Sequence, residues 1–142
     1  MSAELTYAAR STRPGWLRPR LLWLVPGLAI GLYAGRQAEE HGMGLAGIAT
    51  LLIFGILPHL PVLLGRGQPH APGQLAARAV PLFNATHHPI PPLVVLLLSA
   101  AGVLSPLAGV AALAWLSHVV ADLAFGQGLR TRDGWRHSWW TR

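Results

Sequence analysis

The stretch "LAGVAALAWLSHVVADLAF", from Leu107 to Phe125, is the clearest indication of how this chain folds. It is almost uniformly apolar, and its length matches the ~20 residues that a helix needs to cross the hydrocarbon core of a bilayer. Two ionisable side chains, His118 and Asp122, interrupt it. They lie four positions apart, so on a helix they share one face. Because ionisable residues in apolar surroundings are costly, this pair indicates a site.

The composition indicates that lipid surrounds much of the chain. Of the 142 residues, 52% are hydrophobic and only 11% are charged, whereas about a quarter are charged in ordinary soluble domains. The sequence has no cysteine, which excludes disulfides, thiolate metal sites and cysteine nucleophiles. The net charge is +6, and it comes from arginine without any lysine. The arginines cluster at the ends of apolar runs, so we expect no nucleic-acid partner.

Three further apolar stretches lie before Leu107 in the sequence. Together the four stretches predict an all-α fold, a bundle of four transmembrane helices. The expected spans cover residues 21–35, 43–65, 84–102 and 107–125. Pro58 and Pro61 flank His59 in the second span, so we expect that end to be bent or unwound. The turn "GVLSP" between the third and fourth spans is so short that it requires an antiparallel hairpin.

The arginines orient this bundle. They precede the first span, occupy the loop after the second and follow the fourth, at Arg10, Arg13, Arg18, Arg20, Arg66, Arg78, Arg130, Arg132, Arg136 and Arg142. The loop after the first span carries Arg36 against Glu39 and Glu40, and the turn after the third has no charge. Since cytoplasmic loops carry the excess of arginine, both termini and the 66–83 loop are predicted to lie in the cytoplasm.

The segments outside the spans are predicted to be tails. Residues 1–20 are polar and basic, and no convincing cleavage site follows the first apolar run, so we expect a cytoplasmic tail. Residues 21–125 form the membrane domain. Residues 126–142 form a second cytoplasmic tail, in which tryptophans alternate with arginines, a pattern typical of an anchor at the lipid interface. Membrane lipids are therefore expected partners.

Polar side chains from three predicted spans converge near the cytoplasmic face. They are His59 from the second span, Asn84, His87 and His88 from the third, and His118 and Asp122 from the fourth. The predicted topology depends on the arginines alone, so this clustering is an independent indication of a site. Adjacent helical residues point about 100° apart, so His87 and His88 do not both face it.

These residue types suit a metal. Neutral imidazole nitrogen and carboxylate oxygen together bind zinc, iron or manganese, and the predicted ligands are His118, Asp122, His87 and His59. An open coordination position on such an ion activates water. His118, Asp122 and Asn84 are then the candidate catalytic residues, with Asn84 orienting a ligand or substrate. Arg130 is the candidate for neutralising an anionic head group.

The same side chains also suit roles that need no metal. The site could bind and transfer a proton instead of holding a metal ion. His118 and Asp122 could also form a hydrogen bond that joins two helices, or lie solvated at the end of a helix near the interface. The prolines beside His59 equally mark the end of a helix. His70 and His137 lie in polar segments, where we expect them to be solvated.

Three motifs carry a resemblance to known proteins: "FNATH" at 83–87, "WLSHVVAD" at 115–122 and "GQGLR" at 126–130. Together they resemble an uncharacterised family of small four-helix bacterial integral membrane proteins. Its pattern is Asn-x-x-His, then Trp-x-x-His-x-x-x-Asp, then Gly-x-Gly-Leu. The resemblance covers the second half of the chain, implies the four-helix topology, and selects His87 over His88.

The chain also departs from that family. His59 stands where the family tends to carry an aspartate after Leu-Pro, and Leu123 stands where it carries arginine. A more distant similarity links the His-x-x-x-Asp helix to inner-membrane proteins described as metal-dependent hydrolases, and it serves as analogy only.

Three functions fit these observations. The first is an integral metalloprotein of the bacterial inner membrane, a metal-dependent hydrolase acting on a lipid or other amphipathic substrate at the cytoplasmic leaflet. The second is a non-catalytic small subunit or assembly factor, with a membrane-protein partner or a second copy of the chain bound to it. The third is a haem protein with two histidine ligands from different helices. Metal analysis, co-purification and a Soret band separate them.

Overall fold

The structure, a computed structural model, describes residues 21–136, and residues 1–20 and 137–142 lie outside the described part. The described helices are α3 (Leu24–Glu40), α4 (Gly44–Ile56), the 3₁₀ helices η2 (Leu57–Gly65) and η3 (Ala77–Ala79), α5 (Val80–His87), α6 (Ile90–Ala100) and α7 (Pro106–Ala124). Between residues 21 and 136 the only strand-like pairing is an isolated bridge from Arg130 to Arg136. The predicted all-α class is confirmed for this part.

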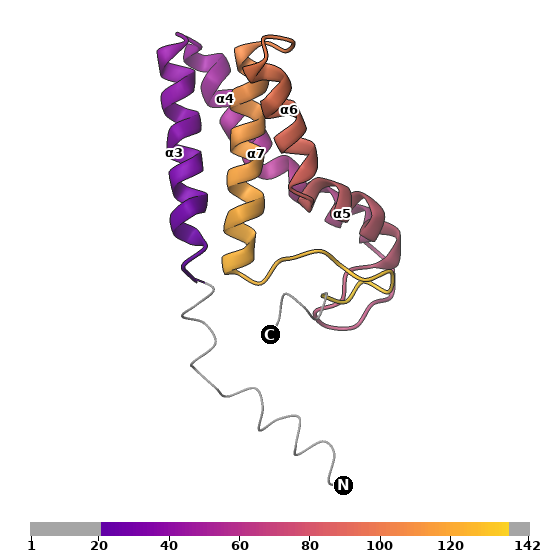
Figure 1. Ribbon diagram of the computed structural model, residues 1–142. Helices are drawn as coiled ribbons and strands as arrows, with labels where there is room; N and C mark the ends of the chain where they lie inside the picture. The colour runs from indigo at the N-terminus through magenta and orange to yellow at the C-terminus, as the bar shows by residue number, and fades with distance from the viewer. Residues whose placement is uncertain (1–20, 137–142) are drawn as a thin grey trace, which may run out of the picture.

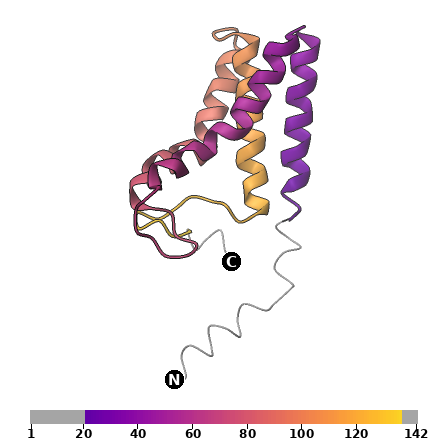
Figure 2. The same ribbon diagram turned by 180° about the vertical axis from the view of Figure 1, so that it is seen from behind.

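α7 is the central helix of the bundle. It packs against α3, α4 and α6, as Figure 1 and the reverse view in Figure 2 show. The residues that α7 buries in its first half are mostly small: Gly109, Val110, Ala111, Ala112, Leu113 and Ala114. Small side chains let neighbouring backbones approach closely, which is how helices associate where hydrophobic driving force is weak.

The ends of α7 follow from its sequence. The Ser105 side chain accepts a hydrogen bond from the backbone N–H of Ala108 at 3.4 Å, and Pro106 takes the first helical position. At the other end Gly126 has a φ of 66°, a conformation that costs glycine little. The helix therefore stops at Ala124, two residues after Asp122, and the chain turns away.

α3 and α7 are antiparallel and approach closely at two glycines of α3. A Cβ added to Gly27 would lie 3.1 Å from the Cβ of Ala121, and one added to Gly31 would lie 2.9 Å from Ser117 Oγ. The Ser117 hydroxyl also donates to the Gly27 carbonyl at 2.7 Å. Close packing and an interhelical hydrogen bond therefore join the two helices.

Leucine at Gly27 should destabilise the protein by about 1–3 kcal/mol, because the side chain would have to displace α7. Leucine at Gly35 is the matched control, since an added Cβ there meets no atom within 4 Å. Both changes give the same gain in helix propensity. Thermal unfolding of the purified protein in detergent, followed by circular dichroism, measures the difference. Equal melting temperatures for the two variants would contradict this packing.

Prolines interrupt two of the four predicted spans. α4 gives way at residue 57 to η2, which has Pro61 inside it, as expected for this stretch. The third span differs from the prediction, because α5 ends at His87 and α6 begins at Ile90. His88 has extended backbone, with φ −81° and ψ 134°. A residue that precedes proline avoids the helical region, and Pro89 follows it.

Residues 57–87, here called the side arm, diverge from the bundle at one end (Figures 1 and 2). The chain after α7 runs back onto this arm: the Leu75 N–H donates to the Gly134 carbonyl at 2.9 Å. A Cβ at Gly134 would overlap the Leu75 carbonyl oxygen, so only glycine fits. Residues 126–136 of the predicted tail are thus packed against the arm, whereas Trp139 and Trp140 lie outside the described residues.

α3 begins and α7 ends at the same end of the bundle. The Leu24 end of α3 is beside the Ala124 end of α7, and the side arm lies at the same end of the bundle (Figure 1). The segment 66–83, which carries Arg66 and Arg78, therefore shares one side with the start of α3 and the end of α7. The arginine pattern predicts this grouping for the ends of the spans, whereas the predicted positions of the termini fall outside the described residues.

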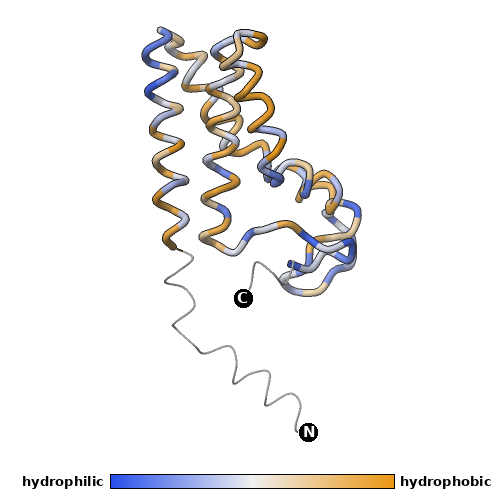
Figure 3. The backbone as a smooth tube through the Cα atoms, in the orientation of Figure 1, coloured by the Kyte–Doolittle hydropathy of each residue, from blue (hydrophilic) through white to orange (hydrophobic). Residues whose placement is uncertain are grey.

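Two of the helical segments are long and apolar enough to span a membrane. They are Gly44–Gly65, with mean hydropathy 2.1, and Pro106–Ala124, with mean hydropathy 1.7. Large apolar side chains are exposed on the bundle, among them Leu32 at 76% and Leu45 at 81%. Figure 3 shows apolar helices between a polar Glu40 end of α3 and a polar loop in the side arm. Exposed apolar surface of this kind marks contact with lipid or another protein.

Candidate metal centre

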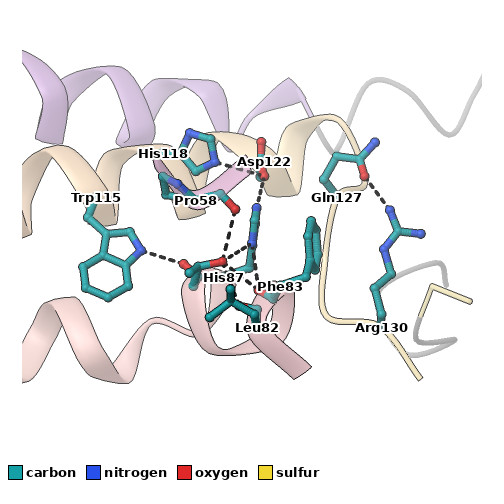
Figure 4. Close-up of polar contacts among 10 residues, drawn as sticks. Pro58, Leu82, Phe83, His87, Trp115, His118, Asp122, Gln127 and Arg130 are labelled. Carbon is teal, nitrogen blue, oxygen red and sulfur yellow. Dashed lines mark hydrogen bonds and ion pairs between the residues drawn. The ribbon is translucent and has the colours of Figure 1, made fainter. Parts of the chain in front are cut away.

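Four side chains converge where the side arm meets α7. His59 comes from η2, His87 is the last residue of α5, and His118 and Asp122 come from α7. One ligand atom of each lies within 4.8 Å of all the others, so the group is close enough to hold a metal ion. Figure 4 shows His87 and His118 directed at the Asp122 carboxylate. The predicted convergence of these four residues is confirmed.

The buried part of this group already has the spacing of ligands around one ion. Asp122 Oδ2 lies 3.1 Å from His87 Nε2 and 3.4 Å from His118 Nε2. A tetrahedral ion with bonds of about 2.0–2.1 Å separates its ligand atoms by roughly 3.3–3.4 Å. All three atoms are buried, and none has a hydrogen-bond partner among residues 21–136. The group therefore presents unpartnered polar atoms to a common point.

A backbone contact fixes the tautomer of His87. Its Nδ1 lies 2.9 Å from the carbonyl oxygen of Phe83. Because a carbonyl oxygen only accepts, Nδ1 carries the proton, and Nε2 of the neutral ring has a lone pair. In a neutral ring that lone pair faces the Asp122 carboxylate, so a proton or a metal ion between the two atoms would remove their repulsion. Metal-binding histidines are oriented by the same kind of hydrogen bond from the second ring nitrogen.

His59 is the exposed member of the group. Its ring centroid lies 4.5 Å from that of His118 and 5.6 Å from that of His87. It sits in η2 immediately after Pro58, where the 3₁₀ geometry replaces the α-helix. Because its ring is exposed, it can move relative to the buried ligands without repacking the core.

Near the breaks in the helices, side chains donate hydrogen bonds to backbone carbonyl oxygens. The Trp115 indole N–H donates to the Thr86 carbonyl at 2.6 Å. The Thr86 hydroxyl donates to the Pro58 carbonyl at 3.1 Å. Irregular backbone is tolerated at membrane depth only where protein groups bond it in this way. These contacts also fasten α5 to α7 and η2 (Figure 4). They keep His87 near His59, whose ring centroid lies 5.6 Å from that of His87.

An aromatic ring joins the cluster to Arg130. Phe83 stacks on His87, with ring centroids 3.8 Å apart and planes 14° from parallel. The guanidinium carbon of Arg130 lies 5.5 Å from the Phe83 centroid. In Figure 4 the Phe83 ring is drawn between His87 and the arginine. Arg130 is therefore held close to the candidate centre without being part of the ligand group.

The Asn84 side chain is bonded to the segment that follows α7. Its Nδ2 donates to the Arg130 carbonyl and its Oδ1 accepts from the Arg130 N–H, both at 2.8 Å. The amide is thus occupied by the backbone of residue 130. In this geometry Asn84 is a positioning residue, and it acts on Arg130.

The Arg130 side chain is partly occupied. Its terminal nitrogens donate to the Gly73 carbonyl at 3.2 Å and to Gln127 Oε1 at 2.7 Å. Its Nε is buried without a hydrogen-bond partner within the described chain. Burial lowers the pKa of the Arg130 guanidinium, and the positive charge of Arg136 lowers it further. The group stays charged, because the ordinary pKa of arginine is far above neutrality.

The remaining described histidines lie elsewhere. His88 Nδ1 accepts from the Ile90 N–H at 3.3 Å, so His88 caps the start of α6, and the choice of His87 over His88 is confirmed. His41 and His70 are exposed and contact backbone carbonyls. The predicted solvated state of His137 falls outside the described residues.

Sequence reasoning missed the residues that build the surroundings of the cluster: Phe83, Thr86, Trp115 and Arg136. Three of them lie inside the motifs "FNATH" and "WLSHVVAD", so their proximity to the histidines was visible. Their roles were not, because the Trp115 bond to Thr86 depends on the break between α5 and α6. Arg136 reaches the site only because the chain after α7 folds back.

Comparisons with protein-family models, curated proteins and solved structures gave no match. The family resemblance of the three motifs therefore stays a prediction, and the candidate centre rests on its own geometry.

Proposed function

We propose that this chain is an integral membrane metalloprotein that holds one divalent transition metal, zinc, iron or manganese. His87, His118 and Asp122 are the buried ligands, and His59 is the exposed one. The observation that carries the proposal is the carboxylate oxygen of Asp122, buried at 3.1 and 3.4 Å from two imidazole nitrogens with no other partner in the described chain. A buried charge requires a counter-charge. A proton between His87 and Asp122 would satisfy one contact, whereas a metal ion satisfies all four groups.

The membrane placement is supported by the apolar surface and the arginine pattern. We propose four membrane crossings. The two candidate spans, at 44–65 and 106–124, supply two of them. α3 and the broken pair α5–α6 supply the others, and with four crossings both termini lie in the cytoplasm. Broken helices are compatible with this placement, because their free carbonyls are bonded by Thr86 and Trp115. The bacterial inner membrane and its lipids are the proposed surroundings.

The chemistry that we propose is hydrolysis of an ester or phosphoester in an amphipathic substrate at the cytoplasmic leaflet. A bound divalent ion with an open position supplies Lewis acidity and an activated water. Catalytic zinc sites keep three protein ligands, and the three buried side chains provide that number. His59 would then be an exchangeable fourth ligand. Because a neutral imidazole has a single lone pair, it would act as the base nearest to solvent only when that lone pair is not bound to the ion. Hydrolysis adds one water across the bond and gives an acid and an alcohol.

The geometry favours a bare ion over a haem. A porphyrin must lie between its two axial imidazoles. Here the His59 and His118 rings contact each other edge-on with centroids 4.5 Å apart, and Asp122 lies against His87 and His118. A flat macrocycle would have to separate these groups.

Metal content and activity of the purified protein test the proposal. In mild detergent we expect about one transition metal per chain, and hydrolysis of at least one member of a panel of fluorogenic lipid esters and phosphoesters. His118→Ala should reduce that activity by about 100-fold or more, whereas His70→Ala, at an exposed loop histidine, should leave it unchanged. Absence of stoichiometric metal, with function insensitive to His118→Ala, would contradict the proposal. A stoichiometric complex recovered from the native membrane would support a subunit role in its place.

A further inference from the structure

A pocket of about 600 Å³ lies directly beside the candidate metal centre, and His59 and Asp122 form part of its wall. The rest of the wall comes from the side arm and from the segment after α7. It includes Val62, Leu75, Phe83, Phe125, Arg130 and Arg136. This volume falls within the ~300–1,000 Å³ of ordinary small-molecule sites. A ligand in this pocket would therefore contact the centre directly.

The wall of this pocket carries two positively charged side chains and one acid. Arg130 and Arg136 both line it, and neither forms an ion pair within 4.0 Å inside residues 21–136. The acid in the wall is Asp122, which the proposed metal would neutralise. Two guanidinium groups in one pocket repel each other unless an anion lies between them.

Arg130 is prepared to bind such an anion. The structure uses two of its five N–H donors, on Gly73 and Gln127. Its Nε, which is buried and unpartnered, is among the donors that remain. Asn84 fixes the backbone of this residue through two hydrogen bonds of 2.8 Å. An arginine held in this way loses little freedom when it binds a ligand.

We infer that the pocket binds a phosphate group, with Arg130 and Arg136 donating to its oxygens. The planar guanidinium matches phosphate oxygens in pairs, and two arginines match the charge of a phosphate dianion. Val62, Leu75 and Phe125 supply an apolar wall for a chain attached to the phosphate. The inference rests on the proposed function, because it names the substrate class of the same site: a phosphorylated amphiphile whose reacting bond lies near the metal.

Calorimetric titration of the full-length protein in detergent tests this inference with three probes. They are dioctanoyl phosphatidic acid, dioctanoylglycerol, which lacks the phosphate, and inorganic phosphate. We expect the phosphatidic acid to bind at least about tenfold more tightly than the diacylglycerol, since hydrogen bonds to charged groups are strong. Arg130→Gln and Arg136→Gln should each weaken this binding by about tenfold. Arg132→Gln is the matched control, because Arg132 is exposed and does not line the pocket.

Each result decides the inference. Inorganic phosphate that binds as tightly as phosphatidic acid would support the anion site and identify free phosphate as its ligand. Phosphate-containing probes that bind no better than diacylglycerol, or affinities unchanged in Arg136→Gln, would overturn it. Arg136→Gln should leave the fold intact, because the Arg136 side chain forms no hydrogen bond within the described residues. Metal content measured on the same samples separates the two proposals. Metal-free protein that still binds phosphatidic acid would refute only the proposed function. Metal-loaded protein that binds neither phosphate probe would refute only this inference.

Discussion

Alanine at Asp122 should abolish stoichiometric metal binding. Asp122 contributes the one carboxylate of the cluster, and its Oδ2 is the atom that both buried imidazoles approach, at 3.1 and 3.4 Å. Loss of partners outside the ligand shell already costs metal sites about 10–100-fold in affinity, so loss of this ligand should cost more than about 100-fold. Competition between the protein and a zinc indicator, with elemental analysis of the dialysed samples, measures the effect.

The control for this variant is Asp133→Ala. Asp133 is an exposed acid in the segment after α7, and it is not among the four clustered residues. The Asp133→Ala protein should bind zinc as tightly as the unaltered protein. Asp122→Ala protein that keeps its metal at unchanged affinity would place the ion elsewhere in the chain.

Removal of the metal should lower the melting temperature of the unaltered protein by roughly 10–20 °C. A ligand at about 1,000 times its dissociation constant adds about 4 kcal/mol of stability, and each kcal/mol corresponds to several degrees in a domain of this size. The proposed ion would join η2, α5 and α7, so its removal would also free the side arm. Melting curves with and without a chelator measure the shift.

The same experiment separates a metal from a hydrogen bond between helices. His87→Phe preserves a ring that can stack on Phe83 but removes the ligand atom. This variant should melt at one temperature with or without chelator. If the unaltered protein also melts at one temperature in both conditions, then His87, His118 and Asp122 join the helices without an ion, and their role is purely structural.

The sequence predicted the central parts of this fold because their signals are local. The apolar run ending at Phe125 predicted α7 almost to the residue, since a lipid-crossing helix needs length and little charge. The spacing of His118 and Asp122 placed both on one face, and the arginines placed the other histidines at the same end. The break at His88 was missed, because proline is tolerated inside membrane helices and "HHPIPP" does not say which turn is lost.

The surroundings of the site could not be predicted for a physical reason. The bonds from Asn84 to Arg130 and from Trp115 to Thr86 join residues 46 and 29 positions apart. They exist only once the side arm has left the bundle and the chain after α7 has returned to it. Short motifs identify the reactive side chains, but the partners of those side chains depend on the path of the backbone between them.

In the proposed site, His59, His87, His118 and Asp122 hold one metal ion. X-ray absorption at the zinc edge, on full-length protein loaded with one equivalent of zinc, tests it most directly. We predict a first shell of nitrogen and oxygen at about 2.0–2.1 Å, with the multiple-scattering signature of at least two imidazoles. A spectrum with oxygen ligands alone and no imidazole scattering, or zinc that washes off on dialysis, would contradict it.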